Sequence, residues 1–215
     1  DDEAIRGEFP FVGSLMNYQH YLCGAVLVAK DWILTSANCL AGTQDSNGLN
    51  VRFGKSKERG RVFAIKECYL HPRYNSTSFD YDIAICKAHR AIEGKNIKPI
   101  RLSRKGFWNR QNAVGQRAVI DYALLELHFS HVPVTSRYRC KTLYGKKITN
   151  RMICAEVGKN NCFGDEGGPL INVKKQLLGI GIRGTNCTDR TKPSAFTNVY
   201  NPDIIYFIID KFLFE

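Results

Sequence analysis

The sequence predicts an all-β fold, an antiparallel barrel or sandwich, with one helix at its C-terminal end. Short apolar stretches rich in β-branched and aromatic residues recur along the chain, and Gly, Asn and Pro separate them. This spacing is typical of antiparallel strands joined by turns, and strands do not alternate with helices. The predicted strands cover residues 21–29, 32–35, 62–69, 83–86, 118–129, 177–182 and 195–199.

Residues 203–214 are the one segment that we predict as a helix. Asp203 is suited to cap its N-terminus, and the apolar residues between Ile204 and Phe212 give it a broad apolar face. We expect this face to pack on the body of the protein. A position on a membrane surface is the alternative, but the segment lacks the basic polar face of membrane-surface helices.

Length and composition favour a compact globular protein. With 215 residues, of which 44% are hydrophobic and 24% charged, the chain can bury a substantial core as one unit or as two small barrels. The longest purely apolar run covers residues 204–209, far below the roughly 18 residues that a membrane span needs. We therefore expect a soluble, mature chain that uses no membrane partner.

The cysteines indicate disulfides and an oxidising, secretory environment. There are eight of them, an even number, and none has the CxxC spacing of metal sites. Spacing alone leaves about 105 connectivities open. Two sequons, at Asn75 and Asn186, are candidate glycosylation sites that fit a secreted, extracellular protein.

The formal charge of +11 predicts a surface that attracts anionic partners. The cations gather in two stretches that contain no acid, at 101–117 and 137–151. One interpretation is a solvated face, and the other is a binding surface for anionic glycans. The candidate surface consists of Arg101, Arg104, Lys105, Arg110, Arg137, Arg139, Lys141, Lys146, Lys147 and Arg151.

An enzyme with unrecognised chemistry is another hypothesis, because His128 and His131 could suggest a metal. On a strand, residues three apart face opposite sides, and no cysteine or carboxylate is spaced to complete a ligand set. We therefore expect surface histidines and no metal. Heme, nucleotide and phosphate-loop motifs are absent, so we expect no cofactor, and no feature predicts nucleic-acid binding.

Three segments resemble the catalytic segments of trypsin-like serine proteases. Residues 35–39, Thr-Ser-Ala-Asn-Cys, are similar to the histidine loop, with Asn38 in place of the histidine. Residues 81–84, Tyr-Asp-Ile-Ala, are similar to the segment of the triad aspartate, here Asp82. Residues 164–169, Gly-Asp-Glu-Gly-Gly-Pro, are similar to the serine loop, with Glu166 in place of the nucleophile. With the matching segment around Gly7 to Leu15, the resemblance covers most of the chain.

The resemblance implies two six-stranded antiparallel β-barrels with a C-terminal α-helix and a cleft between the barrels. The N-terminal barrel would comprise residues 1–100, and the C-terminal barrel with the helix residues 101–215. The resemblance also implies the disulfides: it pairs Cys23 with Cys39, Cys140 with Cys154 and Cys162 with Cys187, with Cys68 and Cys86 as the remaining pair.

The replacements predict that peptide hydrolysis fails. Acyl transfer needs a hydroxyl, an imidazole and a carboxylate, and only Asp82 remains of the three. We expect the side-chain amide of Asn38 to donate to Asp82 as the imidazole would. We also expect Arg183 to pair with Glu166 across the cleft, because an unpaired carboxylate in a partly desolvated cleft is costly.

The resemblance also implies an altered substrate pocket and an altered oxyanion loop. Asp165 matches the aspartate that receives a new amino terminus in active relatives, but no Ile-Val-Gly-Gly segment is present. We therefore expect the loop of Gly164 and Asp165 to stay in a zymogen-like arrangement. The degenerate pocket would consist of Asn160, Ile182, Arg183, Gly184 and Ser194.

At finer grain the sequence resembles mite trypsin-like proteases related to the group 3 allergens, and above all the inactivated serine protease paralogues of the scabies mite. That resemblance implies a secreted pseudoprotease that binds host complement proteins and inhibits complement. The alternative that the residues themselves support is a basic binder of anionic glycans or surfaces without such inhibition.

Overall fold

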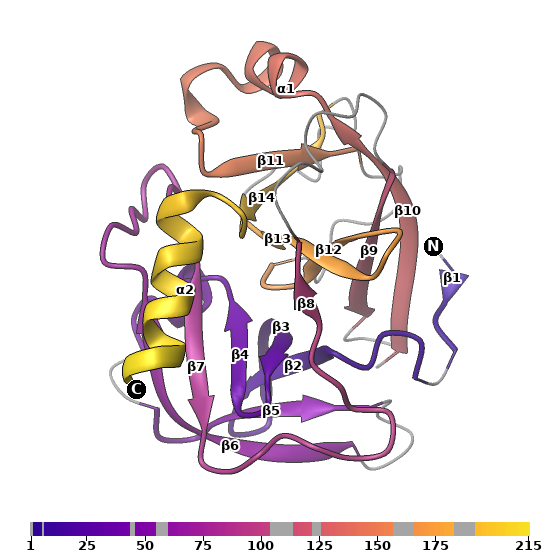
Figure 1. Ribbon diagram of the computed structural model, residues 1–215, viewed down its shortest axis with the longest axis vertical. Coiled ribbons are helices and arrows are strands. Elements are labelled where there is room, and N and C mark those ends of the chain that lie inside the picture. The colour runs from indigo at the N-terminus through magenta and orange to yellow at the C-terminus, as the bar shows by residue number, and fades with distance from the viewer. Residues whose placement is uncertain are drawn as a thin grey trace.

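The fold is described from a computed structural model of the chain (Figure 1). The structure describes residues 2–5, 7–43, 46–54, 60–103, 114–121, 126–156, 166–182 and 192–215. Side chains are described over the same ranges, except those of residues 2, 114–121 and 126. None of the helices within these ranges is long and apolar enough to cross a membrane.

Six strands of the N-terminal half close into an antiparallel barrel in the order β2-β3-β4-β7-β6-β5. Burial alternates along β5, where Leu49, Val51 and Phe53 point into the core between half-buried Asn50 and Arg52. This period of two is that of a strand with one face on a core. The strands are β2 (Val12–Asn17), β3 (His20–Ala29), β4 (Trp32–Thr35), β5 (Leu49–Phe53), β6 (Arg61–Leu70) and β7 (Ala84–Ala88).

A second sheet has the path β1-β10-β11-β14-β13-β12-β9, and β8 pairs with β13. Antiparallel pairing of β9 with β10 brings the two ends of six strands together into a ring. The predicted all-β fold, with two six-stranded antiparallel arrangements, is confirmed. The strands are β1 (Asp2–Glu3), β8 (Arg101–Leu102), β9 (Val114–Asp121), β10 (Glu126–Thr135), β11 (Met152–Ala155), β12 (Pro169–Asn172), β13 (Gln176–Gly181) and β14 (Ser194–Asn198).

The division of the chain near residue 100 stays a prediction. Strand β1 pairs with β10, so residues 2–3 lie on the second sheet although they are close to the start of the chain. Ala4, which follows β1, is buried and donates its N–H to the Leu127 carbonyl over 2.8 Å.

The single strand predicted over residues 118–129 is wrong. The segment contributes to two antiparallel strands, β9 and β10, in which Asp121 stands opposite Glu126. Its sequence contains no Gly, Pro or Asn that would indicate a turn. The apolar residues therefore read as one strand, although they belong to a hairpin.

The described residues form two α-helices, and one of them was predicted. Helix α2 (Pro202–Phe214) covers the predicted segment, but Asn201 caps it in place of Asp203, with its side chain accepting from the Asp203 N–H over 3.0 Å. Helix α1 (Arg137–Tyr144) was not predicted. Among the described residues there are also two short 3-10 turns, η1 (Asn38–Leu40) and η3 (Gly145–Lys147).

Helix α2 packs along the first barrel, as predicted, beside β7 (Figure 1). Ile204 and Ile208 are fully buried in the same core cluster as the barrel strands. Farther along the helix, the ring of Phe212 lies 6.0 Å from that of Trp32 on β4. The C-terminal helix is thus held by apolar contacts with the first barrel.

Three predicted disulfides are confirmed: Cys23–Cys39, Cys68–Cys86 and Cys140–Cys154. The first ties β3 to η1, the second joins adjacent strands β6 and β7, and the third ties α1 to β11. Cys162 and Cys187 lie outside the described residues.

The two sheets approach each other closely at two glycines. A Cβ at Gly24 on β3 would lie 2.8 Å from the backbone N of Gly168, and Gly167 has a φ of +75° with no room for a side chain. The Gly24 N–H donates to the Glu166 carbonyl over 2.8 Å. This backbone contact places Glu166 at the junction of the sheets.

Candidate functional site

The three positions predicted as a degenerate catalytic triad lie together at the junction of the sheets. Asn38 begins η1, Asp82 precedes β7 and Glu166 precedes β12. Ser36, which was not predicted as a site residue, joins them. Its hydroxyl lies 2.8 Å from both carboxylate oxygens of Asp82 and 3.4 Å from Glu166 Oε1. A serine with one proton thus stands between two acids, and the shorter distance places that proton on the Asp82 side.

Asp82 is fully buried, and its hydrogen bonds come from neutral donors. Ser36 Oγ and the backbone N–H of Asn38 each donate to its carboxylate over 2.8 Å. Burial and, to a smaller extent, the charge of Glu166 raise the pKa of Asp82 to about 6, although its hydrogen-bond donors lower it. The site therefore favours a protonated Asp82 more than water does.

The predicted bond from the Asn38 side chain to Asp82 is wrong. Asn38 does bond Asp82, but through its backbone N–H. Its side-chain Nδ2 donates to Glu166 Oε1 over 2.6 Å. Ser36 already donates to the Asp82 carboxylate, and the side-chain amide of Asn38 donates instead to Glu166, which lies within hydrogen-bond distance. The sequence offered one indication of this arrangement: Ser36 lies two residues before Asn38, and its hydroxyl is a second possible donor to Asp82.

A tyrosine extends the network away from Glu166. Tyr74 Oη donates to Asn38 Oδ1 over 3.3 Å, so Asn38 accepts on one side and donates to Glu166 on the other. The amide of Asn38 is thereby bonded at both its oxygen and its nitrogen. This arrangement fixes the orientation of the side chain between two elements that are distant in sequence.

The segment that carries Tyr74 is anchored to the second sheet by an ion pair. Asp80 accepts from the guanidinium of Arg151 through Nη2 and, over 3.1 Å, through Nε. Thr149 Oγ1 adds a hydrogen bond of 2.7 Å to the same carboxylate. Burial would raise the pKa of Asp80, but Arg151 and Thr149 hold it below its ordinary value. This contact is called the Asp80–Arg151 junction below.

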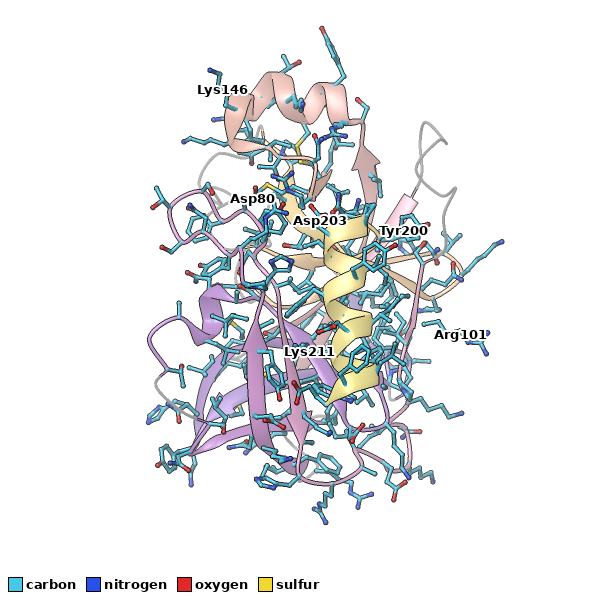
Figure 2. The ribbon with its side chains drawn as sticks, turned by 60° about the vertical axis from the view of Figure 1, so that its left-hand side comes forward. Asp80, Arg101, Lys146, Tyr200, Asp203 and Lys211 are labelled. Atoms are coloured by element: carbon cyan, nitrogen blue, oxygen red, sulfur yellow. A yellow bond between two sulfur atoms is a disulfide. The ribbon has the colours of Figure 1, made fainter. Side chains whose placement is uncertain are left out.

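Helix α2 reaches the same region through its first turn (Figure 2). Tyr81 Oη donates to Asp203 Oδ2 over 3.0 Å, and Arg73 Nη1 lies 3.5 Å from the same oxygen. The guanidinium carbons of Arg73 and Arg151 lie 4.4 and 4.7 Å from the Tyr81 ring centroid. Asp203, predicted as a helix cap, instead anchors Tyr81.

The predicted pocket and oxyanion loop are described only in part. Ile182 and Ser194 are buried, and Ile182 packs in a small cluster with Cys140, Cys154 and Met152. Ser194 stands opposite Ala155 in the sheet. The pairing of Glu166 with Arg183 stays a prediction, because several of these positions lie outside the described residues, namely Asn160, Gly164, Asp165, Arg183 and Gly184.

Neither of the residue groups considered for a metal offers a complete ligand set. The sulfurs of Cys23 and Cys39 lie near the Glu166 carboxylate, but they are bonded to each other and provide no thiolate. His128 and His131 lie three residues apart on β10, so their side chains leave the strand on opposite faces. Among the described residues, the candidate site therefore offers carboxylate and amide groups to a ligand, and no thiolate.

The sequon at Asn75 is exposed, with its Oδ1 accepting from the Thr77 and Ser78 N–H groups over 3.0 and 2.9 Å. Asn186, the second sequon, lies outside the described residues, as do Arg104, Lys105 and Arg110 of the predicted basic surface. Arg101 and Lys146 lie far apart (Figure 2), so they do not belong to one continuous patch. Of the others, Arg139 pairs with Glu156 and Arg151 with Asp80.

Comparisons with known proteins agree with this fold. The sequence model of the trypsin family, described as "Trypsin", matches residues 1–205. A trypsin of Phaedon cochleariae is 30% identical over 89% of this chain and 80% of its own length. Granzyme M of Rattus norvegicus is 31% identical over 92% of this chain and 83% of its own length.

Coagulation factor XI of Bos taurus is 31% identical over 97% of this chain, which spans 37% of that longer protein. The family model and the trypsin relative both cover most of the chain, and the closed six-stranded barrel, second sheet and C-terminal helix agree with them. The chain belongs to the family of trypsin-like serine proteases.

Proposed function

We propose that this chain is a non-hydrolytic member of the trypsin family that acts by binding. The observation that supports this most strongly is the 2.6 Å hydrogen bond from Asn38 Nδ2 to Glu166 Oε1. It joins the two positions at which the family motifs have the general base and the nucleophile. In this proposal the candidate site holds the two sheets together, and partners bind elsewhere on the surface of the protein.

The chemistry of the residues present supports the same proposal. The amide nitrogen of Asn38 donates hydrogen bonds but has no basic lone pair to take a proton from a nucleophile. Attack by the Glu166 carboxylate on an amide would give an anhydride, and the amide N–H of Asn38 is not acidic enough to protonate the leaving amine. Ser36 has a hydroxyl, but it is fully buried and bonded to Asp82. In another serine protease, losing the serine or the histidine alone lowers turnover by about 10⁶.

Hydrolysis of fluorogenic peptides tests the proposal. The wild type and Glu166→Gln are compared over substrates with basic, aromatic and small residues before the scissile bond. We expect both to match the rate without protein. Cleavage by the wild type that is lost in Glu166→Gln would overturn the proposal, because contaminating protease would survive the substitution. Circular dichroism of both proteins confirms that each is folded.

The finer part of the proposal is that the protein is secreted, binds host complement proteins and inhibits complement. Two features support it: the resemblance to the inactivated mite paralogues, and a disulfide-containing fold that is typical of extracellular proteins. Purified protein at micromolar concentration should inhibit complement-mediated lysis, and a heat-denatured sample should not. Lysis that is unaffected by the folded protein would reject this part and leave the non-hydrolytic site untouched.

A further inference from the structure

The described part of the chain carries one strongly charged surface that the candidate site does not use. It consists of four exposed cations on α1 and η3, which we call the α1 ridge: Arg137, Lys141, Lys146 and Lys147. The ridge lies at one end of the long axis of the molecule (Figure 1), well away from Arg101 (Figure 2). It protrudes from the body of the molecule (Figure 1).

The four cations of the α1 ridge form no ion pair with the carboxylates that the structure describes. Within the described ranges, none of them has a carboxylate within the 4 Å of an ion pair. The carboxylate of Glu156 is engaged by Arg139, whose Nε lies 3.2 Å from Glu156 Oε1. Like charges that are not neutralised repel each other, so their free energy falls when an anionic chain lies across them.

A lysine from a distant segment adds to the same surface. Lys192 Nζ lies 5.8 Å from the ring centroid of Tyr144, the last residue of α1. The Tyr144 hydroxyl donates to the Pro193 carbonyl over 2.6 Å, which holds this segment against the helix. The sequence stretch 137–151 does not include Lys192, so the fold brings a lysine from a distant segment to the end of α1.

The helix that carries the α1 ridge is anchored at its N-terminus and to the second sheet. Ser136 caps α1 by accepting from the Arg139 N–H over 3.2 Å, and the Cys140–Cys154 disulfide ties the helix to β11. An eight-residue helix is about 12 Å long. Its neighbouring charges therefore lie within about one Debye length of each other at physiological salt, and their attraction for a polyanion adds up.

We propose that the α1 ridge is a binding site for sulfated polysaccharide chains. A linear polyanion with regularly spaced sulfates matches a convex row of cations without acids, and binding would not need the cleft. An anionic membrane fits less well, because Tyr138 is the one large apolar side chain exposed on α1 and little could insert between lipids. This inference is independent of whether the protein hydrolyses peptides.

Heparin affinity tests the α1 ridge with a matched pair of variants. One variant carries Arg137→Gln, Lys141→Gln, Lys146→Gln and Lys147→Gln. The control carries Lys30→Gln, Lys95→Gln, Lys98→Gln and Arg101→Gln, exposed cations away from α1. Each lowers the formal charge by four from +11, so a difference between them reports position and not net charge. Thermal unfolding confirms that both are folded.

We expect the wild type and the control to elute from heparin above about 0.15 M NaCl, the physiological ionic strength. The ridge variant should bind at least about 20-fold more weakly at that salt, since each exposed ion pair contributes roughly a factor of two to five. Uncharged dextran should not bind any of the three. Equal losses in both variants, elution of the wild type below physiological salt, or binding to phosphatidylserine vesicles without binding to heparin would overturn the proposal.

Discussion

Two of the contacts between the first barrel and the second sheet differ in how their acidic groups are neutralised. At the candidate site, Asp82 and Glu166 are both acids, and their donors are the neutral groups of Ser36 and Asn38. At the Asp80–Arg151 junction, a carboxylate meets a guanidinium and a hydroxyl. Asp80 and Asp82 are only two positions apart in the sequence, so the difference comes from the partners and not from the segment.

The partners decide which protonation state each junction favours. Burial and the nearby Glu166 raise the pKa of Asp82 to about 6, whereas Arg151 and Thr149 keep the pKa of Asp80 below its ordinary value despite burial. In a working triad, the aspartate stabilises an imidazolium that forms during the reaction. No such cation can form at Asn38, so the charge of Asp82 is uncompensated and the junction is electrostatically unfavourable at neutral pH.

The largest expected effect is a pH dependence that belongs to Asp82. Because the folded state raises its pKa from 3.8 to about 6, the stability it provides is present below about pH 4 and is lost as the pH rises through 6. That shift corresponds to about 3 kcal/mol. The side chain introduced by Asp82→Asn does not titrate, so the free energy of unfolding of this variant should gain about 2 kcal/mol on that of the wild type between pH 4 and pH 7, the part of the shift that falls in this pH range. Urea unfolding at both pH values measures it, and a constant difference would contradict the raised pKa.

The Asp80–Arg151 junction should be the more costly of the two to break at neutral pH. Arg151→Met leaves Asp80 partly buried without its cation, and we expect a loss of about 2 kcal/mol in the free energy of unfolding. The matched control is Arg73→Met, which removes a longer and more exposed pair with Asp203 and should cost less than about 1 kcal/mol. Equal losses in urea unfolding would show that the Asp80–Arg151 pair is no stronger than a surface contact.

At the candidate site, removing the second acid should stabilise the protein. Glu166→Gln keeps an oxygen for the Asn38 amide but removes the charge that raises the pKa of Asp82. We expect a gain of about 1 kcal/mol at pH 7 and almost none at pH 4, where Asp82 is protonated. NMR titration of the Asp82 carboxyl carbon should show a lower pKa in the variant. An unchanged pKa would mean that Glu166 does not act on Asp82.

The smallest effect should follow the loss of the tyrosine hydroxyl. Tyr74→Phe removes a bond of 3.3 Å to Asn38 Oδ1, which is near the long limit for an O–H donor, so we expect a loss of about 0.5 kcal/mol. The pKa of Asp82 should not change, because the bond that is lost ends on the side-chain oxygen of Asn38 and not on the Asp82 carboxylate. Destabilisation above about 2 kcal/mol would indicate that Tyr74 has a larger structural role than this one bond.

The strand pattern could be predicted where local sequence determines it. Residues 32–35 form a strand with the predicted bounds, because a short apolar run between turn residues becomes a buried strand. Helix α1 could not be found in this way, since Arg-Tyr-Arg-Cys-Lys-Thr-Leu-Tyr has no apolar periodicity. The Ser136 cap, the disulfide to β11 and the Tyr144 bond to Pro193 hold it, and two of these three connect segments that are distant in sequence.

For the candidate site, the sequence predicts which residues meet but not how they bond. Its positions follow from motifs, and Asn38, Asp82 and Glu166 do meet in the structure. Their hydrogen bonds could not be read from the motifs, because Asn38 and Glu166 are 128 residues apart and each could bond several partners. The close approach of Gly24 to residues 167–168 sets the position of Glu166, and Ser36 then determines which acid receives the Asn38 amide.

The central claim is that the Asn38–Glu166 joint has replaced hydrolysis, and product analysis tests it most directly. A denatured protein substrate is incubated for a day with the wild type, with Glu166→Gln or with buffer, and the peptides are identified by mass spectrometry. We predict the same peptides in all three samples. Cleavage products that form with the wild type and are missing with Glu166→Gln would show that Glu166 takes part in catalysis and would contradict the claim.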